Sequence, residues 1–295
     1  PKSPASLLLL FFIASLSLLS CNRKTPAVLI FSKTEGFTHD AIPDGIEALM
    51  KLGQEHGFDV DTTTNAALFT EEHLQNYSAI IFLNTTGNVL NPQQETEMQR
   101  YIQSGGGFVG VHAAADTEYH WGWYGRLVGG YFLDHPGIND PHPNVQPGTI
   151  LVADPNHPST EFLPERWERT DEWYSYRDIY EEVNVLLKLD EQSYQGGAEM
   201  GDHPVAWYHE FDGGRSFYTG LGHTKESYSD ELFLQHLLAG IEYAIGSSPR
   251  PDYSASRTSP LPEENRFTKT QLILGELFEP TEMTILPNLD ILIAQ

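Results

Sequence analysis

Short apolar runs alternate with segments of helical periodicity over the first half of the chain. Three continuous apolar runs predict buried strands, at 27–32, 77–83 and 107–111. Residues 42–56 and 91–102 have the spacing of amphipathic helices, and Pro43 stands near the start of the first. Strands that alternate with helices at this spacing predict right-handed crossovers and a mostly parallel sheet. We therefore expect an α/β fold, a flavodoxin-like three-layer sandwich.

The second half of the chain carries further strand signals and one strong helix. Residues 149–153 and 183–189 read as strands, and 203–209 with 215–221 as an antiparallel pair around Asp212-Gly-Gly. A strongly apolar helix over 230–245 ends at a glycine. Residues 247–266, rich in proline, serine and charge, predict a linker. The strand-like remainder, 267–295, is too short to bury a core and is predicted to be the truncated start of a second domain.

The first 21 residues differ from the rest in composition. Lys2 precedes an apolar run over 7–19, and Leu18-Leu-Ser-Cys21 closes that run. This order is typical of an export signal and is too short for an ordinary membrane span. We read 1–21 as a lipoprotein signal peptide with lipidation at Cys21, the alternative being a plain signal peptide. The prediction is an exported bacterial lipoprotein, on the periplasmic or outer-membrane side, that contacts the membrane only through its lipid anchor.

Charge and cysteine content exclude several classes of function. The chain has 41 acidic and 17 basic residues and a formal charge of −24, so phosphate backbones would be repelled and nucleic acid is not an expected partner. Cys21 is the only cysteine. The folded part therefore has no disulfide, no zinc-thiolate site and no cysteine nucleophile.

Polar residues stand where strands of the predicted sheet end. His112 follows the strand at 107–111, and three small residues separate it from Asp116. His223 ends the last predicted strand. Ligands of open α/β sheets bind outside the carboxyl ends of the strands, so loops from distant parts of the chain are expected to converge there. The residues expected at this edge are Glu35, His39, His112, Asp116, His135 and His223, and a further candidate edge is formed by Asp171, Glu172 and Tyr174.

Four motifs carry a family resemblance. They are Phe31-Ser-Lys-Thr-Glu-Gly-Phe-Thr-His39, Gly105-Gly-Gly-Phe-Val-Gly-Val-His112-Ala, Asp171-Glu-Trp-Tyr174 and Gly220-Leu-Gly-His223-Thr. Residues 27–246 thereby resemble the ThuA-like (trehalose utilisation) family, a branch of the class I glutamine amidotransferase-like superfamily. The resemblance implies a flavodoxin-like sheet and a role in carbohydrate metabolism, with a small-molecule carbohydrate as partner.

The chain departs from the amidotransferase pattern at the nucleophile. Those enzymes carry a cysteine in the turn after the central strand and a later histidine and glutamate. Here His112 stands in that neighbourhood, and His223 with Glu226 lies roughly where the later pair belongs. Glutaminase thioester chemistry needs the missing sulfur and is excluded. The segment 277–288 resembles the opening of glucose/sorbosone dehydrogenase-type β-propellers, which implies a fused sugar dehydrogenase-like domain.

Two chemistries fit the expected convergence of imidazoles and carboxylates. One is a divalent metal such as zinc, bound by the histidines at 39, 112, 135 and 223. The other is acid–base catalysis, with His112, His223, Asp116 and Glu226 as the catalytic groups. A third reading is that the histidines only hydrogen-bond loops. The predicted substrate-binding residues are Glu35, His39, Trp121, Trp123, Glu172 and Tyr174, the aromatic rings being suited to stacking on sugar faces.

Three functions stay open at this point. The first is an enzyme that acts on a sugar or keto-sugar through a histidine-rich cleft. The second is a non-catalytic carbohydrate-binding module that serves the attached dehydrogenase-like domain. The third is an interaction scaffold whose cleft is vestigial.

Overall fold

The computed structural model describes residues 25–247, 250–262, 282–285 and 291–294. The chain divides into two compact units, the first ending at Pro260 and the second beginning at Leu261. In the second unit, β12 (Glu282–Ile285) and β13 (Ile291–Ala294) pair as antiparallel strands. The predicted signal peptide, Cys21 and most of the predicted second domain lie outside the described residues. Within the described part, no helix is both long and apolar enough to cross a membrane.

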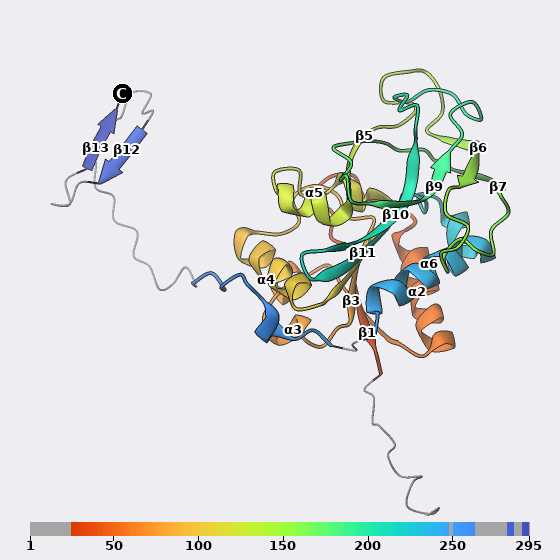
Figure 1. Ribbon diagram of the computed structural model, residues 1–295. Coiled ribbons are helices and arrows are strands. Elements are labelled where there is room, and N and C mark those ends of the chain that lie inside the picture. Colours follow the sequence, from red (N-terminus) through yellow and green to blue (C-terminus); the bar gives the residue numbers. More distant parts are fainter. Residues whose placement is uncertain (1–24, 248–249, 263–281, 286–290, 295) are drawn as a thin grey trace, which may run out of the picture. The chain divides into compact units, whose positions relative to one another are not determined.

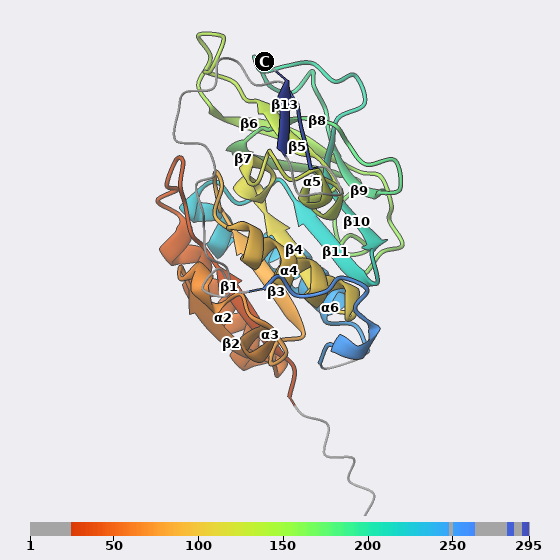
Figure 2. The ribbon, with the colours of Figure 1, turned by 90° about the vertical axis from the view of Figure 1, so that its left-hand side faces the viewer.

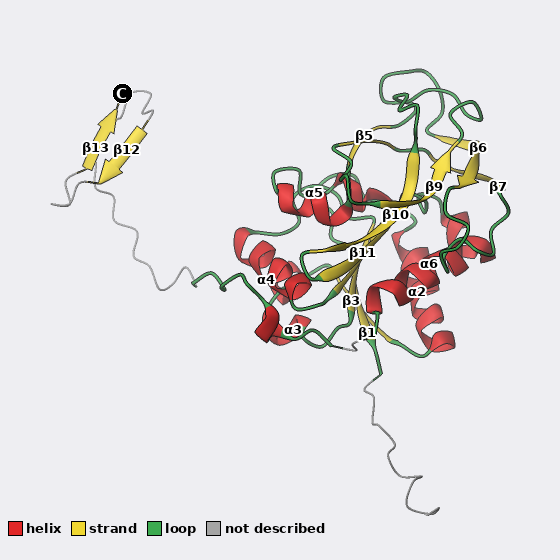
Figure 3. Cartoon of the chain, viewed as in Figure 1, coloured by secondary structure: helices red, strands yellow, loops and turns green. Residues whose placement is uncertain are grey.

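A nine-stranded sheet organises the first unit, in the order β2-β1-β3-β4-β11-β10-β9-β6-β7 (Figures 1 and 3). The strands are β1 (Ala27–Phe31), β2 (Asp59–Thr63), β3 (Ala79–Leu83), β4 (Gly107–Val111), β6 (Val145–Val152), β7 (Arg166–Glu172), β9 (Asn184–Leu189), β10 (Pro204–Phe211) and β11 (Gly214–Thr219). The strands from β2 to β11 pair in parallel, and those from β11 to β7 pair antiparallel. A separate short sheet joins β5 (Tyr131–Asp134) to β8 (Ser175–Arg177).

Helices cover both faces of the sheet. The α-helices are α2 (Ile42–His56), α3 (Glu71–Leu74), α4 (Pro92–Gln103), α5 (Gly122–Val128) and α6 (Glu231–Ile245). Single 3₁₀ turns are η2 (Ala66–Leu68), η3 (His112–Asp116), η4 (Lys225–Ser229) and η5 (Tyr253–Ala255). Figures 1 and 2 show α2 and α6 on one side of the parallel strands and α3, α4 and α5 on the other. The predicted flavodoxin-like, three-layer α/β fold is confirmed.

The apolar runs of the sequence explain the central parallel strands β1, β3 and β4. Every residue of β1, β3 and β4 is buried, as expected of strands covered on both faces. Local signals set the helix ends: Asn91 and Gln94 form a capping box at α4, and α2 ends at Gly57 with φ 78°. The strand β4 and the helix α6 approach closely at Gly107, where an added Cβ would lie 2.2 Å from the carbonyl oxygen of Ala244. Only a glycine fits there.

Candidate functional site

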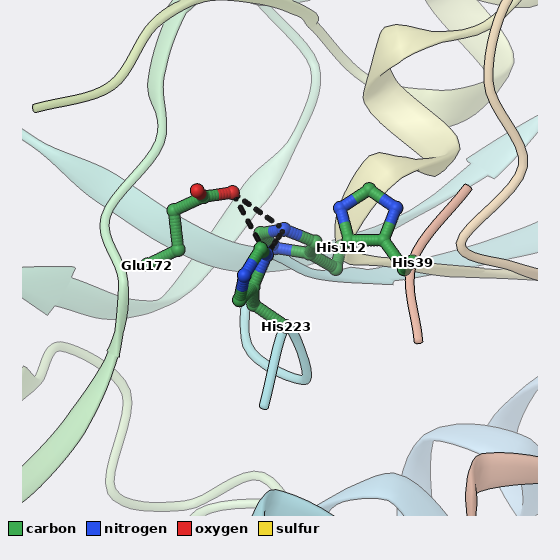
Figure 4. Close-up of side chains that lie close together, drawn as sticks. All are labelled: His39, His112, Glu172 and His223. Carbon is green, nitrogen blue, oxygen red and sulfur yellow. Dashed lines mark hydrogen bonds and ion pairs between the residues drawn. The ribbon is translucent and has the colours of Figure 1, made fainter. Parts of the chain in front are cut away.

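Four side chains from four connections of the sheet meet above the carboxyl ends of its strands (Figure 4). His39 comes from the loop between β1 and α2, and His112 directly follows β4. Glu172 is the last residue of β7, and His223 lies in the loop after β11. One ring nitrogen or carboxylate oxygen from each lies within 4.8 Å of the others. We call these four residues the His–Glu cluster.

The turn after β4 aims His112 into the cluster. Its φ is 48°, in the left-handed region that a residue with a side chain seldom adopts, so the surrounding structure must hold this conformation. The ring Nδ1 is 2.8 Å from the carbonyl oxygen of Gly220, and that carbonyl can only accept. The proton of a neutral His112 therefore sits on Nδ1, and Nε2 presents a lone pair to the cluster.

The three closest atoms of the cluster form a small triangle. His112 Nε2 lies 3.2 Å from Glu172 Oε2 and 3.2 Å from His223 Nδ1. His223 Nδ1 is 2.9 Å from the same Glu172 oxygen. The ring of His39 meets the rings of His112 and His223 edge-on, at centroid distances of 5.1 and 5.0 Å. The other carboxylate oxygen of Glu172 accepts a 2.6 Å hydrogen bond from Asn144 Nδ2.

Burial and mutual charge set the protonation of the cluster. Burial, reinforced by the neighbouring imidazoles, lowers the pKa of His39 to about 2, so its ring is neutral. Burial also works to raise the pKa of Glu172, but the neighbouring imidazoles of His112 and His223 outweigh it and hold that pKa well below its usual range. For His223, burial opposes the charged form, yet the bond to Glu172 prevails and raises its pKa. The carboxylate is ionised and faces nitrogen atoms.

Asp171 fixes the loop that carries His223. Its buried carboxylate accepts from the backbone N–H groups of Gly222 and His223, at 3.0 and 3.1 Å. It also accepts from the guanidinium of Arg169 at 3.0 Å and from the hydroxyl of Ser227 at 3.3 Å. One residue before Glu172, Asp171 thus ties the end of β7 to the loop after β11. The cluster is positioned by these bonds rather than by the loop alone.

A cavity of about 250 Å³ opens over the cluster. Its lining is Phe37, His39, Asp116, Phe132, His135, Asn144, Glu172, Tyr174 and His223. Burial raises the pKa of Asp116, whose Oδ1 accepts a 2.6 Å hydrogen bond from the hydroxyl of Tyr119. Tyr174 packs against the ring of His112 at 4.1 Å between centroids. The cavity combines aromatic walls with several hydrogen-bonding groups.

The structure brings together most of the predicted site residues but places four elsewhere. His39, Asp116, His135, Glu172, Tyr174 and His223 line the cavity, and His112 lies beside them. His135 stands apart from the predicted metal set: its Nε2 is 3.7 Å from Glu172 Oε1, on the far oxygen of the carboxylate. Glu35 is exposed and pairs with Lys33 at 2.8 Å.

The structure places Glu226 and the two tryptophans away from the roles predicted for them. Glu226 is exposed on η4, and the carboxylate that contacts His223 is Glu172, which distant chain pairing delivers. Trp121 and Trp123 stack on each other at 4.9 Å, and the indole N–H of Trp123 donates to Asp212. Trp123 lines a different cavity, and the aromatic walls of this one are Phe37, Phe132 and Tyr174. Trp123, on α5, packs instead against Phe211 of β10 at 5.3 Å between ring centroids.

Sequence reasoning did not single out Asn144 or the two phenylalanines. Phe37 belongs to the Gly-Phe-Thr-His motif before α2, so its proximity to His39 was a usable signal. Nothing in the local pattern marked Asn144, which reaches Glu172 from an irregular loop. A second group of potential ligands among the described residues is Glu95, Glu118 and His120. It differs from the His–Glu cluster because His120 is 51% exposed and Glu118 Oε1 already accepts from two backbone N–H groups.

Comparison with known proteins gives the family. A family model described as ThuA, trehalose utilisation, matches residues 27–244. The chain belongs to the ThuA family. The match confirms the resemblance drawn from the four motifs. The family is linked to carbohydrate metabolism. A search of curated proteins found no match.

Two solved ThuA-like proteins are similar to this member of the family. One, from Bacteroides uniformis ATCC 8492, is 27% identical with a TM-score of 0.64, and the match covers 76% of this chain and 94% of that one. The other, from Parabacteroides merdae ATCC 43184, is 19% identical with a TM-score of 0.60, covering 80% of this chain and 98% of that one. The second likeness supports the fold alone.

Proposed function

We propose that this chain is a carbohydrate-active enzyme that works on a sugar or keto-sugar in the cavity above the His–Glu cluster. The observation that carries the proposal is the convergence of His39, His112, Glu172 and His223 beneath one cavity, which three of them line. Buried ionisable groups that perturb one another in a cleft are typical of catalytic sites. Membership of the ThuA family supports a carbohydrate as the ligand.

The lining of the cavity suits one sugar ring. Phe37 and Phe132 offer apolar faces to the C–H side of a pyranose. The carboxyl of Asp116, the amide of Asn144 and the ring of His135 offer hydrogen bonds to its hydroxyls. Since burial raises the pKa of Asp116, this carboxyl is also suited to exchange a proton with the bound sugar.

The test begins with a thermal-shift screen of the purified chain against monosaccharides, disaccharides and their keto forms. Any ligand that shifts the melting temperature is then incubated with the protein, and its products are analysed by mass spectrometry. We expect conversion that is lost in His223→Ala and reduced in Asp116→Asn, while both variants keep a cooperative unfolding transition. If the ligand binds but is recovered unchanged, and binding survives both substitutions, the chain is a binding module instead. No ligand at all would favour the vestigial scaffold.

We also propose that the chain is exported and anchored at Cys21 by a lipid. The support is the order of charged, apolar and small residues over 1–21. Expression in a bacterium with labelled palmitate should label the chain, and Cys21→Ser should abolish the label. Equal labelling of the two forms would contradict this proposal and leave the enzymatic one untouched.

A further inference from the structure

The triangle formed by His112 Nε2, His223 Nδ1 and Glu172 Oε2 has the dimensions of a coordination face. Its edges are 3.2, 3.2 and 2.9 Å. A cation held at about 2.0–2.2 Å from nitrogen and oxygen ligands keeps neighbouring ligand atoms about 2.9–3.5 Å apart, for angles between octahedral and tetrahedral. The three atoms therefore already stand at the spacing that one bound cation requires.

The positions of the hydrogens in the triangle also favour a bound cation. The carbonyl of Gly220 takes the proton of a neutral His112 at Nδ1, so Nε2 has only a lone pair. The ionised carboxylate of Glu172 is acceptor-only. His223 Nδ1 carries at most one N–H, and the lone pair of His112 Nε2 still faces the carboxylate oxygen of Glu172 at 3.2 Å with no hydrogen between them. A positive charge between them removes this repulsion.

The fourth residue and the surrounding bonds favour a metal ion as that charge. Among the described residues, the buried Nδ1 of His39 has no hydrogen-bond partner, although its ring faces the cluster. Buried polar atoms are seldom left unpaired without a reason such as an absent ion. His112 donates its other ring N–H to a carbonyl, and Asn144 holds the second oxygen of Glu172. Such outer bonds typically orient metal ligands.

We propose that the His–Glu cluster binds one divalent first-row transition-metal ion, with Zn²⁺ as the principal candidate. Three imidazoles and one carboxylate favour such an ion over Mg²⁺ or Ca²⁺, which take oxygen ligands. His39, Glu172 and His223 also line the cavity, so a ligand position left open would face the sugar. The inference rests on the same cavity as the proposed function and names its cofactor.

The experiment measures ion uptake without any sugar, so the metal site and the enzymatic function succeed or fail separately. The full chain is stripped with a chelator and titrated with Zn²⁺ by calorimetry, and the metal content is counted by mass spectrometry. We expect one equivalent per chain. His39→Ala and Glu172→Gln should each weaken binding at least about tenfold. His120→Ala, in the second acidic group, should bind as the unsubstituted chain does.

Two measurements distinguish a loss of metal binding from a loss of folding. Melting curves show which variants are folded, and only those are compared. The Co²⁺ form of the unsubstituted chain should absorb strongly in the visible range, as a four-coordinate site does, and needs no variant. Absence of one-equivalent binding, a spectrum of hydrated Co²⁺, or loss of binding in His120→Ala would each overturn the proposal. Undiminished binding in the cluster variants would overturn it as well.

Discussion

Asp171 offers the sharpest test of how the site is held in place. Its Oδ1 accepts from the backbone of Glu172 and of His223, both at 3.1 Å. Its Oδ2 accepts from Gly222 N at 3.0 Å and from Arg169 at 3.0 Å. In Asp171→Asn, the side-chain NH₂ group would face backbone N–H groups or the Arg169 guanidinium, whichever way the amide is oriented. The buried guanidinium of Arg169 would also lose its closest anion. We expect a clear loss of stability and a displaced His223 loop.

The magnitude follows from the burial of the pair. The side chains of Arg169 and Asp171 are 5% and 0% exposed, so water cannot replace the lost contacts. Removing one partner of a buried ion pair costs about 3–5 kcal/mol. For a domain of this size, each kcal/mol lowers the melting temperature by about 2–4 °C, so the expected fall is at least roughly 6 °C. Urea denaturation followed by circular dichroism measures the free energy of unfolding directly.

Asp230→Asn is the matched control. Asp230 contacts the same guanidinium at 3.4 Å, but it is 31% exposed and caps α6, where asparagine serves equally well. A partly exposed pair contributes at most about 1 kcal/mol. Equal losses in the free energy of unfolding would refute the conclusion that Asp171, through its bonds to the His223 loop, stabilises the domain more than Asp230 does.

Three further changes have expected outcomes. Gly107→Ala should destabilise the fold by about 1–3 kcal/mol in urea denaturation, because its Cβ meets the backbone of α6, whereas Gly122→Ala, with open space around its Cβ, should not. Burial lowers the pKa of His236 to about 4, so the unfolded state binds the extra proton as the pH falls below about 6.5. This proton uptake destabilises the unsubstituted chain by about 2 kcal/mol between about pH 7 and pH 5. His236→Asn should lack this part of the pH-dependent loss. For the sugar found by the screen, Phe132→Ala should weaken binding by about 1 kcal/mol, roughly fivefold, and Trp123→Ala should leave the dissociation constant unchanged.

The central parallel strands β1, β3 and β4 could be predicted from the sequence because they are buried on both faces. Runs such as residues 79–83 are continuously apolar, and no competing interpretation fits their length and flanks. The strand β7 (Arg166–Glu172) escaped prediction for the opposite reason. It is rich in charge, yet Asp171 and Glu172 at its end are buried. Buried carboxylates make sense only with their partners, which come from distant loops.

The candidate site shows the same division. Histidines at strand ends were recognisable, since topology alone brings the carboxyl ends of parallel strands to one edge. The choice of Glu226 rested on its nearness to His223 along the chain, whereas the contacting carboxylate, Glu172, comes from the antiparallel half of the sheet. The residue type of the two tryptophans suits sugar stacking, but their direction depends on how α5 packs. Pairing between antiparallel strands that no short hairpin connects, such as β6 and β9, has no signature in the local pattern.

The position of the His–Glu cluster has a consequence for how the molecule assembles. His39 and His112 depend on the parallel strands, whereas Glu172 arrives on the outermost antiparallel strand, so the four groups meet only when both halves of the sheet have formed. Contacts between residues so distant in sequence tend to form late in folding. Any ligand that binds all four would select the complete native state over partly assembled ones and raise the melting temperature with its concentration. Occupancy of the site would then report on the integrity of the whole domain.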